Sequence, residues 1–243
     1  MYTEPMSGFV SCIVATCDRP RFLAQQLKNY SLQTCPDTEL IVVDDGQQSV
    51  ADLCASVASV RHIRLTQKTH IGTKMNIGIE AAKGNILQKL DDDDYYGPDF
   101  LSLASQRLNS SDNPHALVAW CCFAVLIAGQ GRLFHSGHGW QAGGTLRFHR
   151  EMWKQHPFRD TSGSEDSLFI KDNQPEILRV CAADQYMLVR HGGNAWNAVR
   201  DHAGTYSVEE YFSAQELFPQ SVEEVVGRQS AAFYRSLLQQ PRG

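Results

Sequence analysis

The sequence predicts an α/β fold in which helices cover both faces of a mostly parallel central sheet. Short apolar runs rich in β-branched residues alternate with stretches of helical periodicity through the first half of the chain. Two of these runs end directly in aspartates, at positions 44–45 and 91–94. A regular alternation of strands and helices indicates parallel strands joined by crossover helices. We therefore expect one continuous domain built around a parallel sheet.

The first half of the chain supplies most of that sheet. Its expected strands are residues 9–15, 39–43, 60–65 and 85–90. A helix is expected to begin at Pro20, because proline at the first helical position forfeits no hydrogen bond. Two further helices are expected over 50–57 and 73–83, the second closed by Gly84.

The second half is less regular. Helices are expected over 98–108 and 150–155, and from Ser164 onward, where the serine hydroxyl is expected to cap the first turn. The expected strands are residues 117–127, 131–134, 146–148, 177–181 and 185–191. From Val208 the chain has the spacing of an amphipathic helix. We divide the single domain, residues 1–243, into a first half of about 8–110, a second of about 111–200 and a helical tail of about 201–243.

Composition limits the possible partners. The 243 residues are 42% hydrophobic and 20% charged, which suits an ordinary globular core. The net charge of −5 and the absence of a basic stripe argue against nucleic-acid binding, so any phosphate must be bound locally. Residues 1–8 do not resemble a secretory signal, and the longest apolar stretch, 116–129, is shorter than a transmembrane helix of about 20 residues. We predict a cytoplasmic protein without a transmembrane segment, and leave open a peripheral membrane contact through the tail.

The seven cysteines are odd in number, scattered, and include no C-x-x-C pair. This pattern is more typical of buried thiols in a reducing compartment than of a disulfide framework or a zinc site. We therefore predict free thiols.

The four consecutive aspartates at 91–94 follow an expected buried strand. In an open parallel sheet, ligands bind beyond the carboxyl ends of the strands. Four like charges repel one another, and hard divalent cations bind oxygen ligands together with substrate phosphates. The run therefore indicates a site for Mn²⁺ or Mg²⁺ and a diphosphate; a solvated acidic start of a helix remains the alternative.

The order of these motifs resembles that of family 2 glycosyltransferases, which have the GT-A fold. Asp91-x-Asp93-Asp94, with Pro98 and Leu101 after it, resembles the D-x-D-D motif of that family. Four further segments resemble parts of that family. Residues 10–20 resemble its first strand and turn, and residues 39–46 resemble its second strand with base-binding aspartates. Residues 72–78 resemble the helix before the metal motif, and residues 143–148 resemble the acceptor strand. Ser164-Glu165-Asp166 resembles its E-D motif, so the resemblance covers roughly residues 10–170.

The resemblance implies an inverting transfer of a sugar, hexosyltransferase-like, from a nucleotide diphosphate donor to an acceptor hydroxyl. A UDP-sugar is the favoured donor. The acceptor, whether a glycan, a lipid-linked glycan, a protein or a small molecule, is not indicated. The residues before about 110 would bind the nucleotide sugar, and those of about 111–200 the acceptor.

The resemblance also implies roles for individual residues. Asp93 is expected to hold the cation, with Asp94 sharing it. His191, in an H-x-x-N setting with Asn194, is a third metal candidate or a turn residue beside two glycines. The expected donor-binding residues are Ala15, Thr16, Arg19, Asp45, Lys74, Asn76, Asp91 and Asp92.

Asp45 is expected to accept a hydrogen bond from the imide N–H of the base, while Asp44 caps the turn before Gly46. Asp92 has no role of its own in the family pattern.

Asp166 is the expected general base, because the acceptor hydroxyl must lose a proton, and Glu165 is expected to orient the acceptor or the helix. Three tryptophans stack on sugar rings or belong to the core: Trp140, Trp153 and Trp196.

Two alternatives differ in class. A non-catalytic nucleotide-sugar binder would keep Asp45 and Asp93 but would not need Asp166. A sugar-phosphate nucleotidyltransferase would need a glycine-rich loop to bind a triphosphate, and residues 10–21 contain no glycine.

Overall fold

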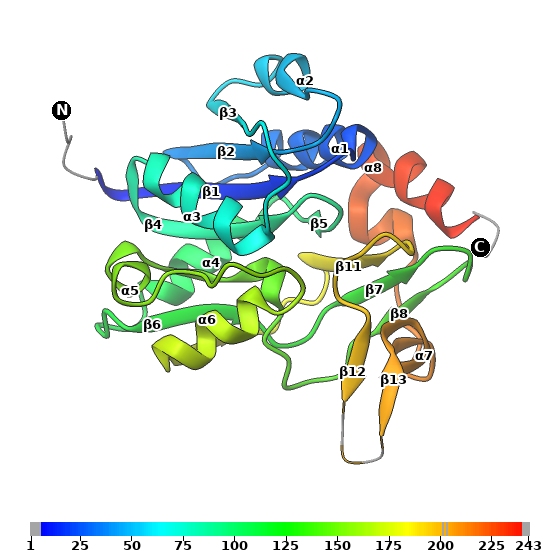
Figure 1. Cartoon of the computed structure of the whole chain (residues 1–243). Helices are drawn as coiled ribbons and strands as arrows, with labels where there is room; N and C mark the ends of the chain where they lie inside the picture. The colour runs from blue at the N-terminus through cyan, green and yellow to red at the C-terminus, as the bar shows by residue number, and fades with distance from the viewer. Residues whose placement is uncertain (1–5, 201, 203, 240–243) are drawn as a thin grey trace.

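The computed structural model describes residues 6–200, 202 and 204–239, and its main feature is a seven-stranded sheet (Figure 1). Its strands in spatial order are β10 (Glu176–Val180), β6 (Ala116–Trp120), β9 (Arg147–His149), β4 (Gly84–Asp91), β1 (Met6–Thr16), β2 (Thr38–Asp44) and β3 (Val60–Arg64). In this sheet β9 runs antiparallel to both of its neighbours, and the other pairings are parallel. The mostly parallel sheet expected from the sequence is confirmed.

Two groups of helices cover this sheet, as the apolar runs of its strands require. Along β1, Cys12 and Val14 pack in one apolar cluster with α1 (Pro20–Ser31) and α4 (Phe100–Leu108). Ile13, which points to the opposite face, packs with the residues of α3 (Ile71–Ala81), α5 (Arg150–Gln155) and α6 (Glu165–Asn173). The short α2 (Ala51–Ala55) lies next to β3 (Figure 1). Pro20 is at the start of α1, as predicted.

A second, four-stranded sheet lies beside the first (Figure 1). Its order is β5 (Tyr95–Tyr96), β11 (Tyr186–Arg190), β7 (Ala124–Ile127) and β8 (Leu133–His135). Its apolar side chains form a third cluster with α8 (Val222–Leu238), so the tail covers the core of its own domain. The chain also contains a 3-10 turn, η1 (Gly143–Thr145), a hairpin of β12 (Ala198–Arg200) and β13 (Thr205–Ser207), and α7 (Val208–Ser213).

Several boundaries differ from the prediction for identifiable reasons. The expected strand 117–127 is two strands, because β6 and β7 belong to different sheets. The tail contains two helices, and each begins at a capping box, Ser207 with Glu210 and Ser221 with Glu224. Ser164 precedes α6, but its hydroxyl makes no capping hydrogen bond.

The prediction of free thiols is wrong for two cysteines, since Cys121 and Cys181 form a disulfide. Trp120 of β6 lies opposite Val180 of β10 in the parallel register, so the residues that follow them, Cys121 and Cys181, also lie opposite one another. Their Cα atoms are 5.7 Å apart, within the range that a disulfide spans. The cysteines therefore no longer argue for a reducing compartment.

Of the helices in the described part of the chain, none combines the length and the apolar character needed to span a bilayer.

Candidate active site

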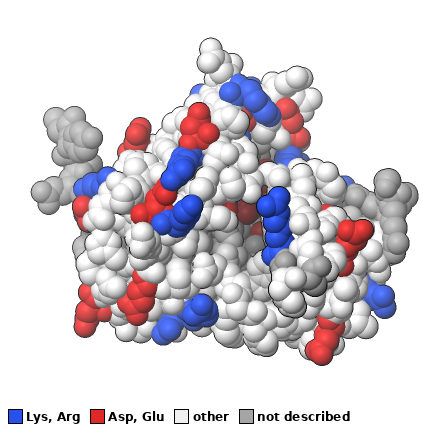
Figure 2. All heavy atoms as spheres, turned by 60° about the horizontal axis from the view of Figure 1, so that its bottom comes forward, with Lys and Arg blue, Asp and Glu red and all other residues white. Residues whose placement is uncertain are grey.

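The site lies where the carboxyl ends of the central strands meet. In the parallel register Ala15 of β1 is opposite Asp91 of β4, and Thr16 is opposite Asp44 of β2. A cavity of about 990 Å³ opens beyond these ends, and the acidic run 91–94 is part of its lining. Figure 2 shows a hollow near the middle of one face, with acidic atoms in its depth and basic side chains beside it. A cavity therefore lies at the strand ends where the sequence predicts a ligand site, and the roles of its residues stay predictions.

Asp93 lies at the centre of a polar cluster in this cavity. Its Oδ2 atom accepts hydrogen bonds from Arg19 Nη1 at 2.8 Å and Asn194 Nδ2 at 3.1 Å, and lies 3.0 Å from His191 Nε2. Burial raises the pKa of the Asp93 carboxyl, but the hydrogen bond with His191 and the charge of Arg19 outweigh burial and lower the pKa below its usual value. Asp93 is therefore an anion in this site.

Asp93 and His191 fit the geometry of a cation site. Two adjacent ligands of an octahedral ion, each with a bond of about 2.1 Å, lie about 3.0 Å apart, which matches the separation of these two atoms. The carboxylate is the ligand type that Mg²⁺ and Mn²⁺ prefer, whereas imidazole is more typical of Zn, Cu, Fe and Ni sites. The His191 ring is held behind Asp93 by stacking on Phe22, with ring centroids 4.3 Å apart.

Asp92 is turned toward the first strand-to-helix turn. It accepts hydrogen bonds from Thr16 Oγ1 at 2.7 Å and from Arg19 Nη1 at 3.0 Å. Burial and the neighbouring charge of Asp93 raise the pKa of Asp92 to about 6. The guanidinium of Arg19 thus lies between the carboxylates of Asp92 and Asp93.

The structure does not place Asp94 as a ligand shared with Asp93. Its two oxygens accept hydrogen bonds from Tyr186 Oη at 2.6 Å and from the backbone N–H of Val189 at 2.8 Å. Burial, followed by the charges of Asp93 and Asp91, holds the pKa of Asp94 well above its usual value. Asp94 instead joins the acidic run to β11, because its side chain faces the second sheet.

Asp91 and Asp166 face one another across a buried lysine. The Nζ atom of Lys89 contacts Asp91 Oδ1 and lies 3.3 Å from Asp166 Oδ2. Burial raises the pKa of Asp166 to about 7; Lys89 lowers it and Glu165 adds to the rise. Glu165 itself is 4% exposed, and its Oε2 has no hydrogen-bond partner among the described residues.

The expected acceptor strand 143–148 begins as the 3-10 turn η1, and two glycines of this turn let the carboxylates pack against it. A Cβ atom on Gly143 would lie 2.2 Å from Asp166 Oδ2, and one on Gly144 would lie 2.6 Å from Asp91 Oδ2. The hydroxyl of Tyr96 accepts a hydrogen bond from the N–H of Asp91 and donates one to the carbonyl of Gly144. These two hydrogen bonds hold Asp91 close to Gly144. The glycine pair therefore forms one wall of the site.

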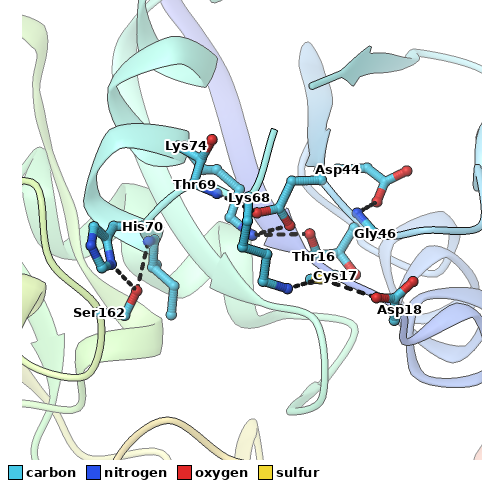
Figure 3. A network of polar contacts seen from close by, with 12 residues as sticks. Thr16, Cys17, Asp18, Asp44, Gly46, Lys68, Thr69, His70, Lys74 and Ser162 are labelled. Carbon is cyan, nitrogen blue, oxygen red and sulfur yellow. Dashed lines mark hydrogen bonds and ion pairs between the residues drawn. The ribbon is translucent and has the colours of Figure 1, made fainter. Parts of the chain in front are cut away.

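The residues of the expected base pocket are hydrogen-bonded to one another (Figure 3). Asp45 accepts from Lys74 Nζ at 2.9 Å and from the N–H of Thr69 at 2.7 Å, and Lys74 also donates to the carbonyl of Thr16 at 3.0 Å. Burial raises the pKa of Asp45, but the bonds from Lys74 and Thr69 outweigh burial and lower it. Lys74, expected near a phosphate, is therefore the partner of Asp45.

Residues that the sequence did not single out complete this pocket. Lys68 reaches across to the thiol of Cys17 (Figure 3). Asp18, at a φ of 52°, accepts a hydrogen bond from the backbone N–H of Gln47. Asp44 caps its turn through the N–H of Gly46 at 2.8 Å, as expected. An exposed lysine in a loop gives no signal in a single sequence, so Lys68 could not have been found.

Asn76 does not lie among the residues that line the cavity. Its amide donates to the carbonyl of Phe158 at 2.8 Å and accepts from Trp153 Nε1 at 2.8 Å. It therefore joins α3 to α5 and to the segment that follows α5, and the contact of Asn76 with the donor stays a prediction. Trp153 is held with it, whereas Trp140 and Trp196 line the cavity.

Comparison with known proteins places the chain among glycosyltransferases. The model of glycosyl transferase family 2 matches residues 11–159. The uncharacterized glycosyltransferase YwdF of Bacillus subtilis (strain 168) is 26% identical over 109 residues, which are 44% of this chain and 41% of that protein. The matched part thus spans about two fifths of the curated relative.

Two solved structures have a fold similar to that of this chain. The mannosyltransferase PcManGT from Pyrobaculum calidifontis, in complex with GDP-Man and Mn²⁺, matches with a TM-score of 0.58 at 16% identity, over 74% of this chain and 56% of that chain. TarS 1–349 of S. aureus, in complex with UDP-GlcNAc, matches with a TM-score of 0.59 at 17% identity, over 77% of this chain and 60% of that chain. The GT-A fold expected from the sequence is confirmed.

Proposed function

The chain belongs to glycosyl transferase family 2, and we propose that it is a metal-dependent inverting enzyme that moves a sugar from a nucleotide diphosphate donor to an acceptor hydroxyl. The observation that carries the proposal is that Asp93 and Asp166 line one cavity of about 990 Å³. The first belongs to the acidic run after β4 and the second to the first turn of α6. A single displacement needs a leaving-group site and a base on opposite sides of one sugar, and Asp93 and Asp166 would supply these two parts.

The leaving-group side is built from Asp93, His191 and Arg19. Asp93 and His191 would hold the cation, which supplies charge stabilisation to the departing diphosphate when bound. Arg19 is 27% exposed at its side chain and lies beside Asp92 and Asp93, where its guanidinium can bind diphosphate oxygens. These residues would orient the donor so that its anomeric carbon faces the acceptor side.

The acceptor side is built around Asp166. Its pKa of about 7 lies near neutral pH, where a general base acts most efficiently. Asp166 would take the proton of the acceptor hydroxyl as that oxygen attacks the anomeric carbon. Glu165, immediately before it and buried, would keep the first turn of α6 in place. Trp140 and Trp196, with Tyr211, form part of the remaining wall, where the acceptor would bind.

We infer that the nucleotide of the donor is uridine diphosphate, and guanosine diphosphate is the alternative against which its affinity is compared. TarS is a structural neighbour with UDP-GlcNAc, and PcManGT is one with GDP-Man. The loop that carries Lys68 and Thr69, together with the turn of Cys17 and Asp18, would contact the base.

Calorimetry tests the donor side directly. We expect UDP to bind in Mn²⁺ and in Mg²⁺, to bind more weakly in EDTA, and to bind more tightly than GDP. Equal affinity in EDTA would remove the cation from the proposal. Tighter binding of GDP would replace uridine by guanosine and leave the reaction class intact.

Turnover separates the enzyme from a non-catalytic nucleotide-sugar binder. A non-catalytic nucleotide-sugar binder would bind UDP with the same dependence on the metal, but it would neither hydrolyse a UDP-sugar nor transfer its sugar. The buried lysine that lies between Asp91 and Asp166 favours the enzyme, because a binding protein has no need of an ionised acceptor-side carboxylate. Release of UDP from a panel of UDP-sugars, measured with and without simple sugar acceptors, decides between them.

A further inference from the structure

Lys89 lies in the middle of the candidate active site, although no feature of the sequence assigned it a role. It belongs to β4, two residues before Asp91, so both side chains point to the same face of the sheet. Its side chain is 2% exposed. Its Nζ atom contacts Asp91 Oδ1 and lies 3.3 Å from Asp166 Oδ2. The ammonium therefore joins the donor side of the cavity to its acceptor side.

The charges around Lys89 are all negative. Asp91 and Asp166 contact it, and Glu165 adds a third carboxylate nearby; the phenol of Tyr96, also close to Asp91, remains neutral because burial holds its pKa well above its usual value. A buried lysine is unstable without charged partners, and two or three adjacent carboxylates are unstable without a cation. The group is consequently stable only as a set, in which one ammonium offsets the repulsion among the neighbouring carboxylates.

The packing leaves Asp166 few other positions. Gly143 lies so close that any Cβ atom would collide with the carboxylate, and Asp166 Oδ1 is buried without a hydrogen-bond partner among the described residues. Lys89 is the cation that contacts this carboxylate in the structure. Without it, burial and repulsion from Glu165 and Asp91 would favour the protonated acid, which cannot act as a base.

We propose that Lys89 is a positioning residue for sugar transfer, whose ammonium holds the Asp166 carboxylate ionised and beside Asp91 while the acceptor hydroxyl gives up its proton. The proposal rests on the proposed function. It states how the base of that reaction is kept in its active form. The residue acts through Asp166 and itself contacts neither the donor nor the acceptor.

The decisive variant is Lys89→Met, which keeps the length of the side chain and removes its charge. At pH 7 we expect kcat to fall by roughly 10- to 100-fold, which is part of the loss of about 10²- to 10⁴-fold that removal of a base causes. The acid limb of the kcat profile should move to higher pH by one unit or more, because the pKa of Asp166 rises when Lys89 is lost. Lys89→Arg should recover part of the rate. Lys154→Met, on an exposed side chain of α5, is the matched control and should not change the rate.

A double variant tests whether Lys89 acts through Asp166. In an Asp166→Asn background, Lys89→Met should cause little further loss of kcat, because the two residues work as a unit. Additive losses, or an unchanged pH profile with a rise in KM alone, would overturn the proposal. Either result would mean that Lys89 contributes to folding or to donor binding.

One measurement does not depend on activity. The carboxyl group of Asp166 can be titrated by carbon-13 NMR in the protein without donor, in wild type and in Lys89→Met, with Asp166→Asn to assign the signal. A higher pKa in the Met variant supports the proposal even if no donor is turned over, and an unchanged pKa refutes it. If wild type neither binds UDP nor releases it from UDP-sugars, the proposed function fails separately.

Discussion

The imidazole Nε2 of His191 lies 3.0 Å from the carboxylate Oδ2 of Asp93, although the two residues follow strands of different sheets. Asp93 follows β4 of the central sheet, and His191 follows β11 of the second sheet. Asn194 donates to the same oxygen and accepts the N–H of His191, so the turn after β11 is tied to the acidic run at both ends. This contact joins the two sheets at the position where the cation is proposed to bind.

Asp93→Asn should remove metal-dependent donor binding. The amide keeps the shape of the carboxylate but loses the charge that a divalent cation needs, so we expect the affinity for UDP in Mn²⁺ to fall at least about 10-fold, by analogy with other metal-site residues. The melting temperature of the apoprotein should fall, because the lowered pKa of Asp93 means that its ionised form stabilises the fold, but the protein should remain folded because Arg19 keeps Asp92 as a partner. Calorimetry and thermal melts on one preparation test both claims, with exposed Asp112→Asn as control. Unaltered affinity for UDP in Mn²⁺ would show that Asp93 is not a ligand.

His191→Ala should raise the Mn²⁺ concentration needed for half-maximal UDP binding, while affinity at saturating Mn²⁺ recovers at least in part. The reason is that one of two proposed protein ligands is removed and the carboxylate remains. Titration of Mn²⁺ at fixed UDP gives this value, and His115→Ala, at the residue before β6 and outside the lining of the cavity, is the control. If the half-maximal concentration stays the same and only stability falls, His191 is a support for Asp93 and not a ligand.

Asp166→Asn should retain UDP affinity and lose turnover by about 10²- to 10⁴-fold. In the wild type, turnover should rise with pH through the Asp166 pKa of about 7, because the base must be ionised. The stability of the folded protein should instead fall as pH rises. The folded-state pKa is raised, so the contribution of Asp166 to stability is present at low pH and is lost as pH rises toward about 7.

Melting temperatures of wild type and Asp166→Asn between pH 5 and pH 8, in the absence of donor, check this sign. The variant should lose less stability than the wild type over that range. Asp92, with its pKa raised to about 6, contributes a similar fall in both proteins and sets the background. A steeper loss in the variant than in the wild type would contradict the assignment of a raised pKa to Asp166.

Gly143→Ala should reduce turnover more than donor binding. A Cβ atom at this position would lie 2.2 Å from Asp166 Oδ2, so the carboxylate or the turn must move. We expect at least a 10-fold loss of kcat with UDP affinity within a few-fold of wild type, since a displacement near 1 Å can cost about 100-fold in rate. Full activity in this variant would show that Asp166 is free to move without loss of function.

The disulfide can be checked by counting thiols. Unfolded, unreduced protein should react at five cysteines, Cys12, Cys17, Cys35, Cys54 and Cys122, and reduced protein at all seven. The bond joins residues 60 apart, and its loss in Cys121→Ser should lower the free energy of unfolding by roughly 2–4 kcal/mol. Reductant should lower the melting temperature of wild type and of Cys35→Ser, but not that of Cys121→Ser. Seven reactive thiols without reductant would rule the bond out.

The sequence by itself determined the features that depend on local pattern. Apolar runs such as the one before Asp44 become buried parallel strands because their side chains can be covered on both faces, and the aspartates then stand at the strand ends. That pattern predicts the edge of the sheet at which the cavity lies. Together with the resemblance to family 2, it also singles out Asp93 and the Glu165-Asp166 turn. The capping of the turn by Asp44 is equally local, since it involves a backbone N–H two residues away.

Tertiary structure alone decided which partners these side chains have. Asp94 and Asp93 are neighbours in sequence, but backbone direction turns one toward Tyr186 and the other toward His191 and Arg19. Lys74 and Asn76 lie on one helix, yet the first meets Asp45 and the second meets Trp153. Contacts between distant segments depend on the register and packing of whole elements, and one chain carries no pattern that records them. For the same reason the Cys121–Cys181 bond and the place of Lys89 between Asp91 and Asp166 emerge only when the strands are assembled.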